Sequence, residues 1–215
     1  LGFVLIFKAS GVFNFAQGAM VLFAALTFVR LLEMGIPMLA AIGVTMVIMV
    51  ILAIAIERIV LRPLVNQDLI ILFMATIGLN YFIEGMAQLV WDSKVHVLDL
   101  GIDEYDAFEI GEAFINKFDV YAALIAGGLV LVLSLFFRYT VIGRALRAVA
   151  DDHQAALSVG IPLRTIWIYV WSTAGIVAMV AGVVWGSKLG VQFAISSVAL
   201  KAIPVLIIGG FTSVP

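Results

Sequence analysis

Long apolar runs separated by short polar segments extend along the whole chain. Five of these runs come close to or exceed the roughly 20 residues that an α-helix needs to cross a bilayer core of about 30 Å. The pattern therefore predicts an all-α fold, a polytopic membrane protein built as a bundle of spanning helices. The five predicted spans are residues 14–32, 37–56, 69–91, 119–138 and 165–186.

The apolar segments at the two ends of the chain differ from these spans. Residues 1–7 are too short to cross a bilayer and read as the final part of a helix. Residues 196–211 are interrupted by Pro204 and closed by two glycines, which predicts a broken or half-helix that packs against protein. Because both ends of the sequence fall inside apolar segments, we expect a single transmembrane domain over residues 1–215 that is truncated at both ends.

Composition supports the membrane prediction and excludes several other classes of protein. Hydrophobic residues make up 64% of the chain and charged residues only 12%, about half the charged share of a soluble domain. No basic tract of the kind that binds nucleic acid is present in the sequence. The sequence has no cysteine, and its histidines, His96 and His153, stand far apart, so neither a thiolate nor a histidine metal site is expected.

The distribution of charge predicts the orientation of the loops, because short loops rich in lysine and arginine stay in the cytoplasm. Residues 57–68 carry Arg58 and Arg62, and residues 139–164 carry three arginines, so we expect both segments to be cytoplasmic. Residues 92–118 hold two lysines against seven acidic residues, and we expect this loop to be periplasmic. The number of predicted spans between these loops agrees with all three assignments.

One polar stripe runs along the predicted span 69–91. Thr76, Asn80 and Glu84 recur every four residues and so share one helix face, with Gln88 in the same row. A carboxylate inside a span is costly unless it faces water or a partner. The stripe is therefore either a structural set of hydrogen-bonding groups or part of the lining of a translocation pathway.

Asn14 and Gln17 raise the same alternative at the start of the first span. They follow the turn-prone residues 9–11. Their side chains either cap or bridge an interrupted helix or line the pathway.

Small residues recur every four positions in the last span. This row of small side chains gives one helix face on which another backbone can approach closely. Packing inside one subunit, a dimer contact and a pore-lining face remain open as its use. The row consists of Ala174, Ala178, Gly182 and Gly186.

The polar segment after the fourth span predicts a short amphipathic helix that begins near Gly143. Its apolar side is predicted to hold Leu146, Val149, Ala150, His153 and Leu157, with the arginines on other faces. Gly160 and Pro162 end it before the next span. The helix is rich in alanine and has adjacent aspartates, which favours docking to another protein over lying on the membrane surface.

Four separated motifs carry a resemblance to a known family. They are SGVFNFAQGAM (residues 10–20), ERIVLRPL (57–64), GRALRAVADDHQAALSVGI (143–161) and LKAIPVLIIGGFTSVP (200–215). Together they resemble the permease subunits of bacterial ABC importers of the branched-chain amino acid type, a group that also includes urea and short-amide importers.

The resemblance implies a transport subunit rather than an enzyme. It implies a multi-pass protein of the bacterial inner membrane that forms a pore with a second, identical or homologous permease subunit. Two cytoplasmic ATPase subunits would bind ATP and Mg²⁺, so this chain would hold no cofactor, and a periplasmic solute-binding protein would deliver a small polar solute. The sequence itself has no phosphate-binding loop of the type G-x-x-x-x-G-K-[ST].

The family's cytoplasmic coupling motif corresponds to the segment that begins at Gly143. The resemblance assigns contact with the ATPase to Arg144, Arg147, Asp151, Asp152, His153 and Gly160. It places Gln17 where many members have histidine, so a proton-linked role is not expected there.

Two other classes of function were compared with the importer. A secondary transporter or channel needs paired ionisable groups near the membrane midplane, and the sequence offers the single carboxylate Glu84. An intramembrane enzyme needs a nucleophile with a base, or a metal pair, and neither G-x-S-x-G nor H-E-x-x-H is present.

Overall fold

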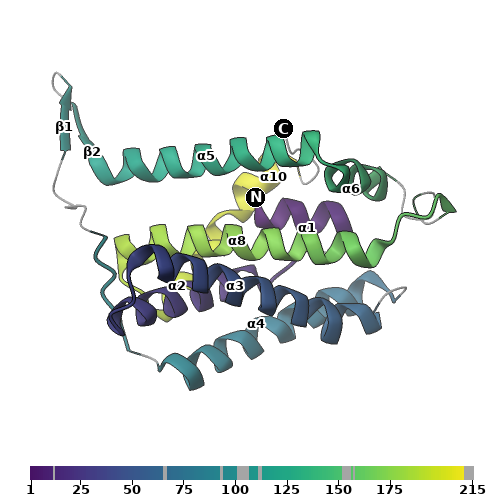
Figure 1. Ribbon diagram of the computed structural model, residues 1–215, viewed down its shortest axis with the longest axis horizontal. Helices are drawn as coiled ribbons and strands as arrows, with labels where there is room; N and C mark the ends of the chain where they lie inside the picture. The colour runs from purple at the N-terminus through teal and green to yellow at the C-terminus, as the bar shows by residue number, and fades with distance from the viewer. Residues whose placement is uncertain are drawn as a thin grey trace.

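The computed structural model is a bundle of long, roughly parallel or antiparallel helices (Figure 1). It describes residues 1–11, 13–64, 67–92, 94–100, 107–110, 113–151, 156 and 158–210. Four of its helical segments are long and apolar enough to cross a membrane: Met38–Leu64, Leu69–Trp91, Lys117–Tyr139 and Leu163–Leu189. The prediction of an all-α, polytopic membrane protein is thereby confirmed.

The described elements agree closely with the predicted spans, and the span 69–91 is reproduced to the residue. In chain order they are α1 (Gly2–Ser10), α2 (Gln17–Glu33), α3 (Met38–Ile56), the π-helical turn η1 (Glu57–Leu61), the 3-10 turn η2 (Arg62–Leu64), α4 (Leu69–Trp91), β1 (Ala107–Ile110), β2 (Ala113–Asn116), α5 (Lys117–Tyr139), α6 (Val141–Asp151), α8 (Leu163–Leu189), η3 (Phe193–Ser197), α9 (Val198–Lys201) and α10 (Ile203–Gly209).

Helix α2 is the core of the bundle. Its 17 residues correspond to a length of about 25 Å, and most of them are buried between α3, α4, α8 and η3. A helix that is apolar on all sides must be enclosed by other elements. Its close contacts depend on glycine: a Cβ atom at Gly182 of α8 would lie 2.6 Å from the carbonyl oxygen of Val21, and one at Gly18 would overlap the carbonyl oxygen of Ser196.

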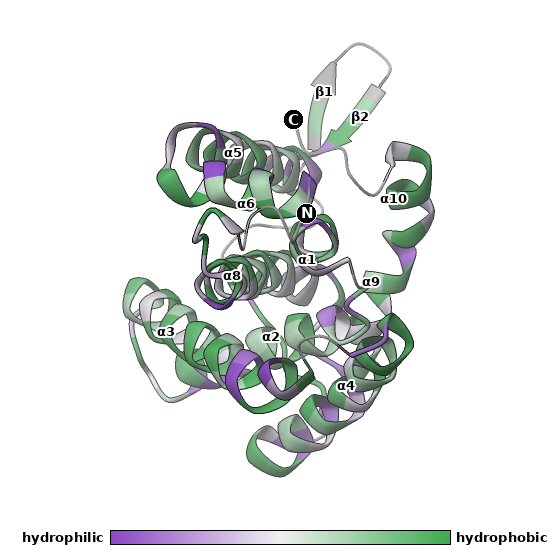
Figure 2. Ribbon diagram, turned by 90° about the vertical axis from the view of Figure 1, so that its right-hand side faces the viewer, coloured by the Kyte–Doolittle hydropathy of each residue, from purple (hydrophilic) through white to green (hydrophobic). Residues whose placement is uncertain are grey.

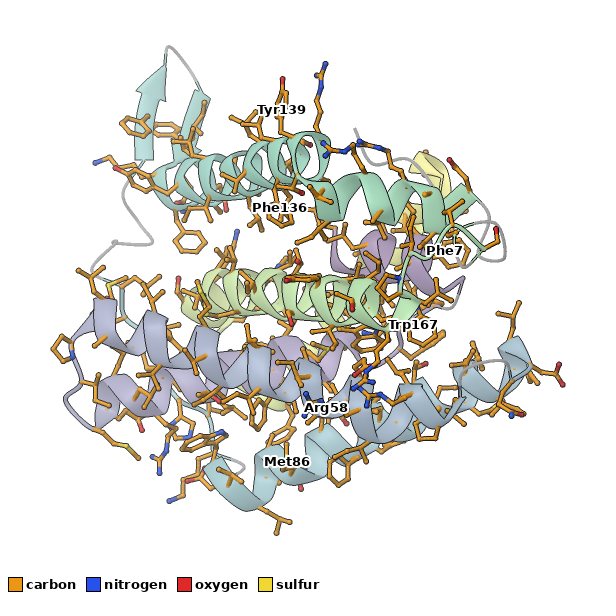
Figure 3. All side chains as sticks on the ribbon, turned by 45° about the vertical axis from the view of Figure 1, so that its right-hand side comes forward. Phe7, Arg58, Met86, Phe136, Tyr139 and Trp167 are labelled. Atoms are coloured by element: carbon orange, nitrogen blue, oxygen red, sulfur yellow. The ribbon has the colours of Figure 1, made fainter. Side chains whose placement is uncertain are left out.

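The outer surfaces of the bundle are apolar (Figure 2). Leu39 of α3, Leu89 of α4 and Ile208 of α10 are each at least 85% exposed. In α5 the side chain of Phe136 lies on the side that faces α8, whereas Tyr139 lies on the opposite side (Figure 3). Exposed leucine, isoleucine and phenylalanine over whole helix faces fit a surface in contact with lipid.

The polar segments gather at two ends of the bundle. The β-hairpin and the segments next to it lie at one end, and the connection between α3 and α4 lies with α6 at the other (Figure 1). The predicted loop 57–68 is shorter than expected, because helical structure continues to Leu64. The predicted loop 92–118 contains the hairpin, in which Ala107 pairs with Asn116 and Ile110 with Ala113. Its alternating phenylalanine and isoleucine residues are typical of strands.

The last apolar segment is broken into η3, α9 and α10, as its proline predicts. Pro204 is the second residue of α10, where a missing backbone N–H leaves no hydrogen bond unmade. The break therefore falls at Ala202, which leaves short helical pieces beside α1 and α2.

A buried ion pair joins η1 to η2 at the α6 end. The Glu57 side chain is 1% exposed and receives two hydrogen bonds from Arg62, at 3.0 Å and 3.5 Å, while Arg62 is 33% exposed. The arginine thus neutralises a carboxylate that the bundle encloses.

We expect Arg62→Ala to lower the free energy of unfolding by about 2–3 kcal/mol, because it leaves the buried Glu57 carboxylate unpaired. Lys188→Ala is the matched control. It removes an ion pair with Asp119 in which both side chains are largely exposed, and we expect a loss below about 1 kcal/mol. Unfolding of the purified protein in detergent measures both values, and equal losses would contradict the structural role of Arg62.

Candidate translocation pocket and coupling helix

A pocket of about 480 Å³ lies between α1, α4 and the η3–α9 segment. Two residues of the predicted polar stripe, Asn80 and Glu84, line one side of it. Ser196 and Ser197 line it from η3, and their hydroxyl groups donate to carbonyl oxygens of the preceding turn at 2.9 Å and 2.7 Å. The volume is within the range of pockets that hold small molecules.

Three phenylalanines form the apolar wall of this pocket. Phe3 and Phe13 stack with ring centroids 4.6 Å apart, and Phe13 meets Phe15 edge to face at 4.8 Å. Phe73 of α4 continues the row, 5.0 Å from Phe15. Contacts of this kind hold aromatic rings in fixed orientations, so α1, the α1–α2 connection and α4 are joined through one aromatic row.

Asn80 and Glu84 are half-buried and one helical turn apart. Within the described part of the chain neither side chain has a hydrogen bond or an ion pair, so the amide and the carboxylate both face the pocket without a protein partner. A half-buried carboxylate that lacks a partner favours a cation or water in front of it.

The other residues of the stripe have different surroundings. The Thr76 hydroxyl donates to the carbonyl oxygens of Phe73 and Phe13, at 2.9 Å and 3.2 Å, and accepts from the N–H of Phe15 at 3.4 Å. It therefore fastens the α1–α2 connection to α4. Gln88 is exposed and does not line the pocket.

Asn14 and Gln17 lie at the junction of α1 and α2 and do not line the pocket of Asn80 and Glu84. Both are buried. The Asn14 side chain accepts from the N–H of Ala16 at 3.1 Å and donates to the Gln17 side chain at 3.4 Å. Gln17 in turn donates to the carbonyl oxygen of Ala174 at 3.2 Å and borders a smaller cavity of about 150 Å³.

Sequence reasoning missed the aromatic wall and the role of Gly18. The spacing of Phe13 and Phe15 inside the motif SGVFNFAQGAM was the available signal for the wall. Gly18 lies in the same motif, but its reason is a contact with Ser196, which is 178 positions away in the chain. Only the folded backbone reveals that contact.

Helix α6 is capped and held at its first turn. The Thr140 hydroxyl accepts from the N–H of Gly143 at 3.1 Å, as an N-cap does. A Cβ atom at Gly143 would overlap the carbonyl oxygen of Phe137, so glycine permits the tight corner between α5 and α6. Arg147 donates to the same carbonyl at 3.1 Å.

The faces of α6 are divided between packing and solvent. Leu146 and Val149 are buried, whereas Arg144, Arg147 and Asp151 are exposed. The remaining predicted coupling positions lie further along: Gly160 has a φ of +83° and precedes the backbone hydrogen bond from Ile161 to Ala156, at 3.0 Å. Asp152 and His153, together with Leu157 of the predicted apolar side, fall outside the described residues.

The row of small residues on α8 faces the interior of the bundle. Ala174, Ala178, Gly182 and Gly186 are all buried. Gly182 lies against α2, and a Cβ atom at Gly186 would lie 2.8 Å from a methyl group of Val191. The row is thus in contact with this same chain.

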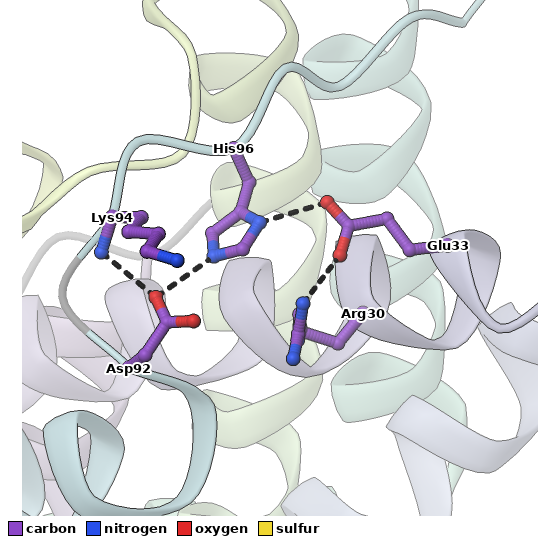
Figure 4. A network of polar contacts seen from close by, with 5 residues as sticks. All are labelled: Arg30, Glu33, Asp92, Lys94 and His96. Atoms are coloured by element: carbon purple, nitrogen blue, oxygen red, sulfur yellow. Dashed lines mark hydrogen bonds and ion pairs between the residues drawn. The ribbon is translucent and has the colours of Figure 1, made fainter.

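A polar network ties three segments together at the hairpin end (Figure 4). The buried His96 ring lies 2.7 Å from Glu33 and 3.4 Å from Asp92, and Glu33 also pairs with Arg30 at 2.8 Å. The backbone of His96 pairs with Val191, at 3.0 Å and 2.7 Å. The ends of α2, α4 and α8 are therefore joined at one point.

The two carboxyl groups of this network have lowered pKa values. Burial alone would raise the pKa of Glu33, but its hydrogen bonds to His96 and Arg30 outweigh burial, so the pKa lies below the ordinary 4.5. The backbone N–H of Lys94, followed by the contact with His96, lowers the pKa of Asp92 below 3.8. The folded protein thus favours both groups in the ionised form.

The fold and the pocket define a class of protein: a multi-pass membrane protein with a polar pocket of solute size between its helices. The family model described as branched-chain amino acid transport system, permease component, matches residues 1–215. The chain belongs to this family. It is a permease subunit of an ABC transporter, resides in the inner (cell) membrane and serves transport rather than catalysis.

Individual relatives agree with the family match. The high-affinity branched-chain amino acid transport system permease protein BraD of Pseudomonas aeruginosa is 26% identical over 229 residues, which cover all of this chain and 75% of the relative. The corresponding protein LivH of Salmonella typhimurium is 27% identical over all of this chain and 74% of its own length. The L-arabinose transport system permease protein AraH of Escherichia coli is 23% identical over 64% of this chain and 41% of its own. No solved structure matches the chain with statistical significance.

The lowered carboxyl pKa values predict a loss of stability in acid. Since the folded state binds protons less readily at Glu33 and Asp92 than the unfolded state does, their stabilisation is complete above about pH 4.5 and is lost as the pH falls through the folded pKa values. We expect the melting temperature to drop between about pH 4.5 and pH 3, and to drop less in His96→Gln, which cannot form the ion pairs. Lys188→Gln, remote from the network, should show the wild-type slope; a wild-type slope in His96→Gln would contradict the assignment.

Proposed function

We propose that the chain is a pore-forming subunit of an importer that uses ATP hydrolysis in partner subunits to move branched-chain amino acids into the cell. The observation that carries this proposal is the pocket in which the unpartnered groups of Asn80 and Glu84 face a wall of phenylalanine rings. Such a pocket presents one charged end and one apolar side to a bound solute.

A branched-chain amino acid fits this division of the pocket. The Glu84 carboxylate offers a partner for the ammonium group, and Asn80 offers an amide that can both donate and accept. Phe3, Phe13 and Phe15 offer an apolar surface to the aliphatic side chain. Urea and short amides, which are transported by importers that the sequence also resembles, have no apolar side chain to use this wall and no ammonium group to pair with Glu84.

The energy for transport comes from partner subunits in this proposal. Two cytoplasmic ATPases bind ATP and Mg²⁺, and α6 docks on one of them through its exposed face, which includes Arg144, Arg147 and Asp151. Asp152, His153 and Gly160 extend the same docking segment. A second permease subunit, identical or homologous, completes the pore, and no nucleic acid takes part.

Alternating access follows from how α6 is attached. Thr140, Gly143 and Arg147 hold α6 against the end of α5, and α6 also contacts α1 and α8. A push on α6 is therefore transmitted to α1 and α8, which border the aromatic wall and the row of small residues. Such a rigid-body movement can switch the pocket between outward and inward openings.

The acidic segment 92–118 faces the periplasm in this arrangement and contributes to the surface that receives a solute-binding protein. The network of His96, Glu33 and Asp92 would anchor that surface to the ends of α2, α4 and α8. The segment 139–164 then faces the cytoplasm, in agreement with its arginines.

Replacing the pocket carboxylate tests the pathway. We expect Glu84→Gln to lower leucine uptake at limiting concentration about tenfold or more, because a hydrogen bond to a charged group contributes roughly 1.5–3 kcal/mol. Gln88→Ala, one turn further along α4 but outside the pocket, is the matched control and should transport normally. Uptake by the complete importer in proteoliposomes is the measurement. Normal kinetics in well-assembled Glu84→Gln would remove Glu84 from the pathway.

The corner at Gly143 tests the coupling role of α6. In Gly143→Ala the new methyl group overlaps the Phe137 carbonyl, so α6 must shift, and we expect substrate-stimulated ATP hydrolysis by the assembled importer to fall at least about tenfold. Gly128→Ala on α5 adds the same methyl group where no atom lies within 4 Å, and it should couple normally. If Gly143→Ala assembles and couples like wild type, α6 does not transmit the movement.

A further inference from the structure

A second pocket, of about 330 Å³, lies between α1, α5 and α6 and is unrelated to the stripe on α4. Three cationic residues line it, one from each helix: Lys8, Arg138 and Arg147. No carboxylate is found among the described residues of its lining. Apolar side chains from the same three helices complete the wall: Leu5, Phe137 and Leu146.

The positive charge of this pocket is not neutralised by the described part of the chain. Arg147 uses one N–H on the Phe137 carbonyl oxygen, at 3.1 Å, which fixes its guanidinium group at the rim and leaves other donors available. Lys8 is half-buried and has no hydrogen bond or ion pair to a described residue. Like charges in a partly buried space repel one another unless an anion lies between them.

The depth of the pocket along the bundle points to the membrane interface. Lys8 is in the last turn of α1, and Arg138 is in the last turn of the spanning helix α5. Basic pockets between spanning helices on the cytoplasmic side are suited to anionic lipid head groups, which lie at this level. The apolar wall below the cations can accept the start of an acyl chain.

We propose that this pocket binds the phosphate group of an anionic phospholipid of the cytoplasmic leaflet. The lipid phosphate accepts hydrogen bonds from Lys8 and Arg147, and Arg138 adds a third positive charge at the rim. The occupied pocket bridges α1, α5 and α6 and so relieves the repulsion between their cations. The proposal rests on the proposed cytoplasmic orientation of α6 and is independent of the transported solute.

The test uses the complete importer in nanodiscs of phosphatidylcholine alone or of an equal mixture with phosphatidylglycerol. We expect phosphatidylglycerol to raise the melting temperature of the wild-type importer and to remain bound in native mass spectrometry. Lys8→Gln should reduce retention of phosphatidylglycerol about fivefold, the effect expected for removal of one interfacial cation. Arg58→Gln removes one exposed cation at the same end of the bundle but outside the pocket, and it should retain phosphatidylglycerol as wild type does.

Further arms separate the outcomes. Lys8→Arg keeps the charge and should keep the lipid; Arg138→Gln serves in place of Lys8→Gln if that variant does not assemble, and should also lose retention. Inorganic phosphate added in detergent separates a lipid site from a soluble-anion site. If phosphate alone reproduces the stabilisation, or if Lys8→Gln and Arg138→Gln retain phosphatidylglycerol like Arg58→Gln, the lipid site is refuted. Loss of leucine uptake with retained lipid would concern the transport proposal alone.

Discussion

The arrangement of this protein depends on the enclosure of α2, a helix that is apolar on every side. Its burial requires other backbones to approach it closely, and glycine makes these approaches possible. Gly182 lets α8 meet α2 at Val21, and Gly18 lets η3 meet the first turn of α2. In a bilayer the packing of helices depends on such close contact, because lipid is as apolar as leucine and offers no hydrophobic drive between helices.

The same enclosure creates the irregular segments on which the proposed function relies. The α1–α2 connection and η3 are non-helical backbone at the depth of spanning helices, which is tolerated only inside protein or beside a polar cavity. Thr76 and Asn14 satisfy the exposed backbone groups of the connection. The pocket of Asn80 and Glu84 lies beside these two segments, so the aromatic wall and the polar side belong to elements that α2 holds in place.

Rigid attachment at one end and a charged network at the other set the limits for movement of the bundle. At the α6 end, Gly143 and Arg147 bring α5, α6 and α1 together around the cationic pocket. At the hairpin end, His96 joins the ends of α2, α4 and α8. A push transmitted through α6 would therefore act on a unit whose far end is fastened, which favours tilting of helices over their separation. Lipid in the cationic pocket would act on the same three helices as a docked ATPase.

Hydropathy alone determined the helical class, the bounds of α4, the approximate bounds of the other spans and the break at Pro204, because the length of an apolar run and the geometry of proline are local properties. Four-residue spacing likewise placed Asn80 and Glu84 on one face. The tertiary structure decided the rest. It separated Asn14 and Gln17 from that face, brought Phe3, Phe13 and Phe15 opposite it, and gave Gly18 and Gly143 their partners. These contacts join residues that the sequence keeps apart or turn on a backbone corner, and no local periodicity records which backbone will approach a given glycine.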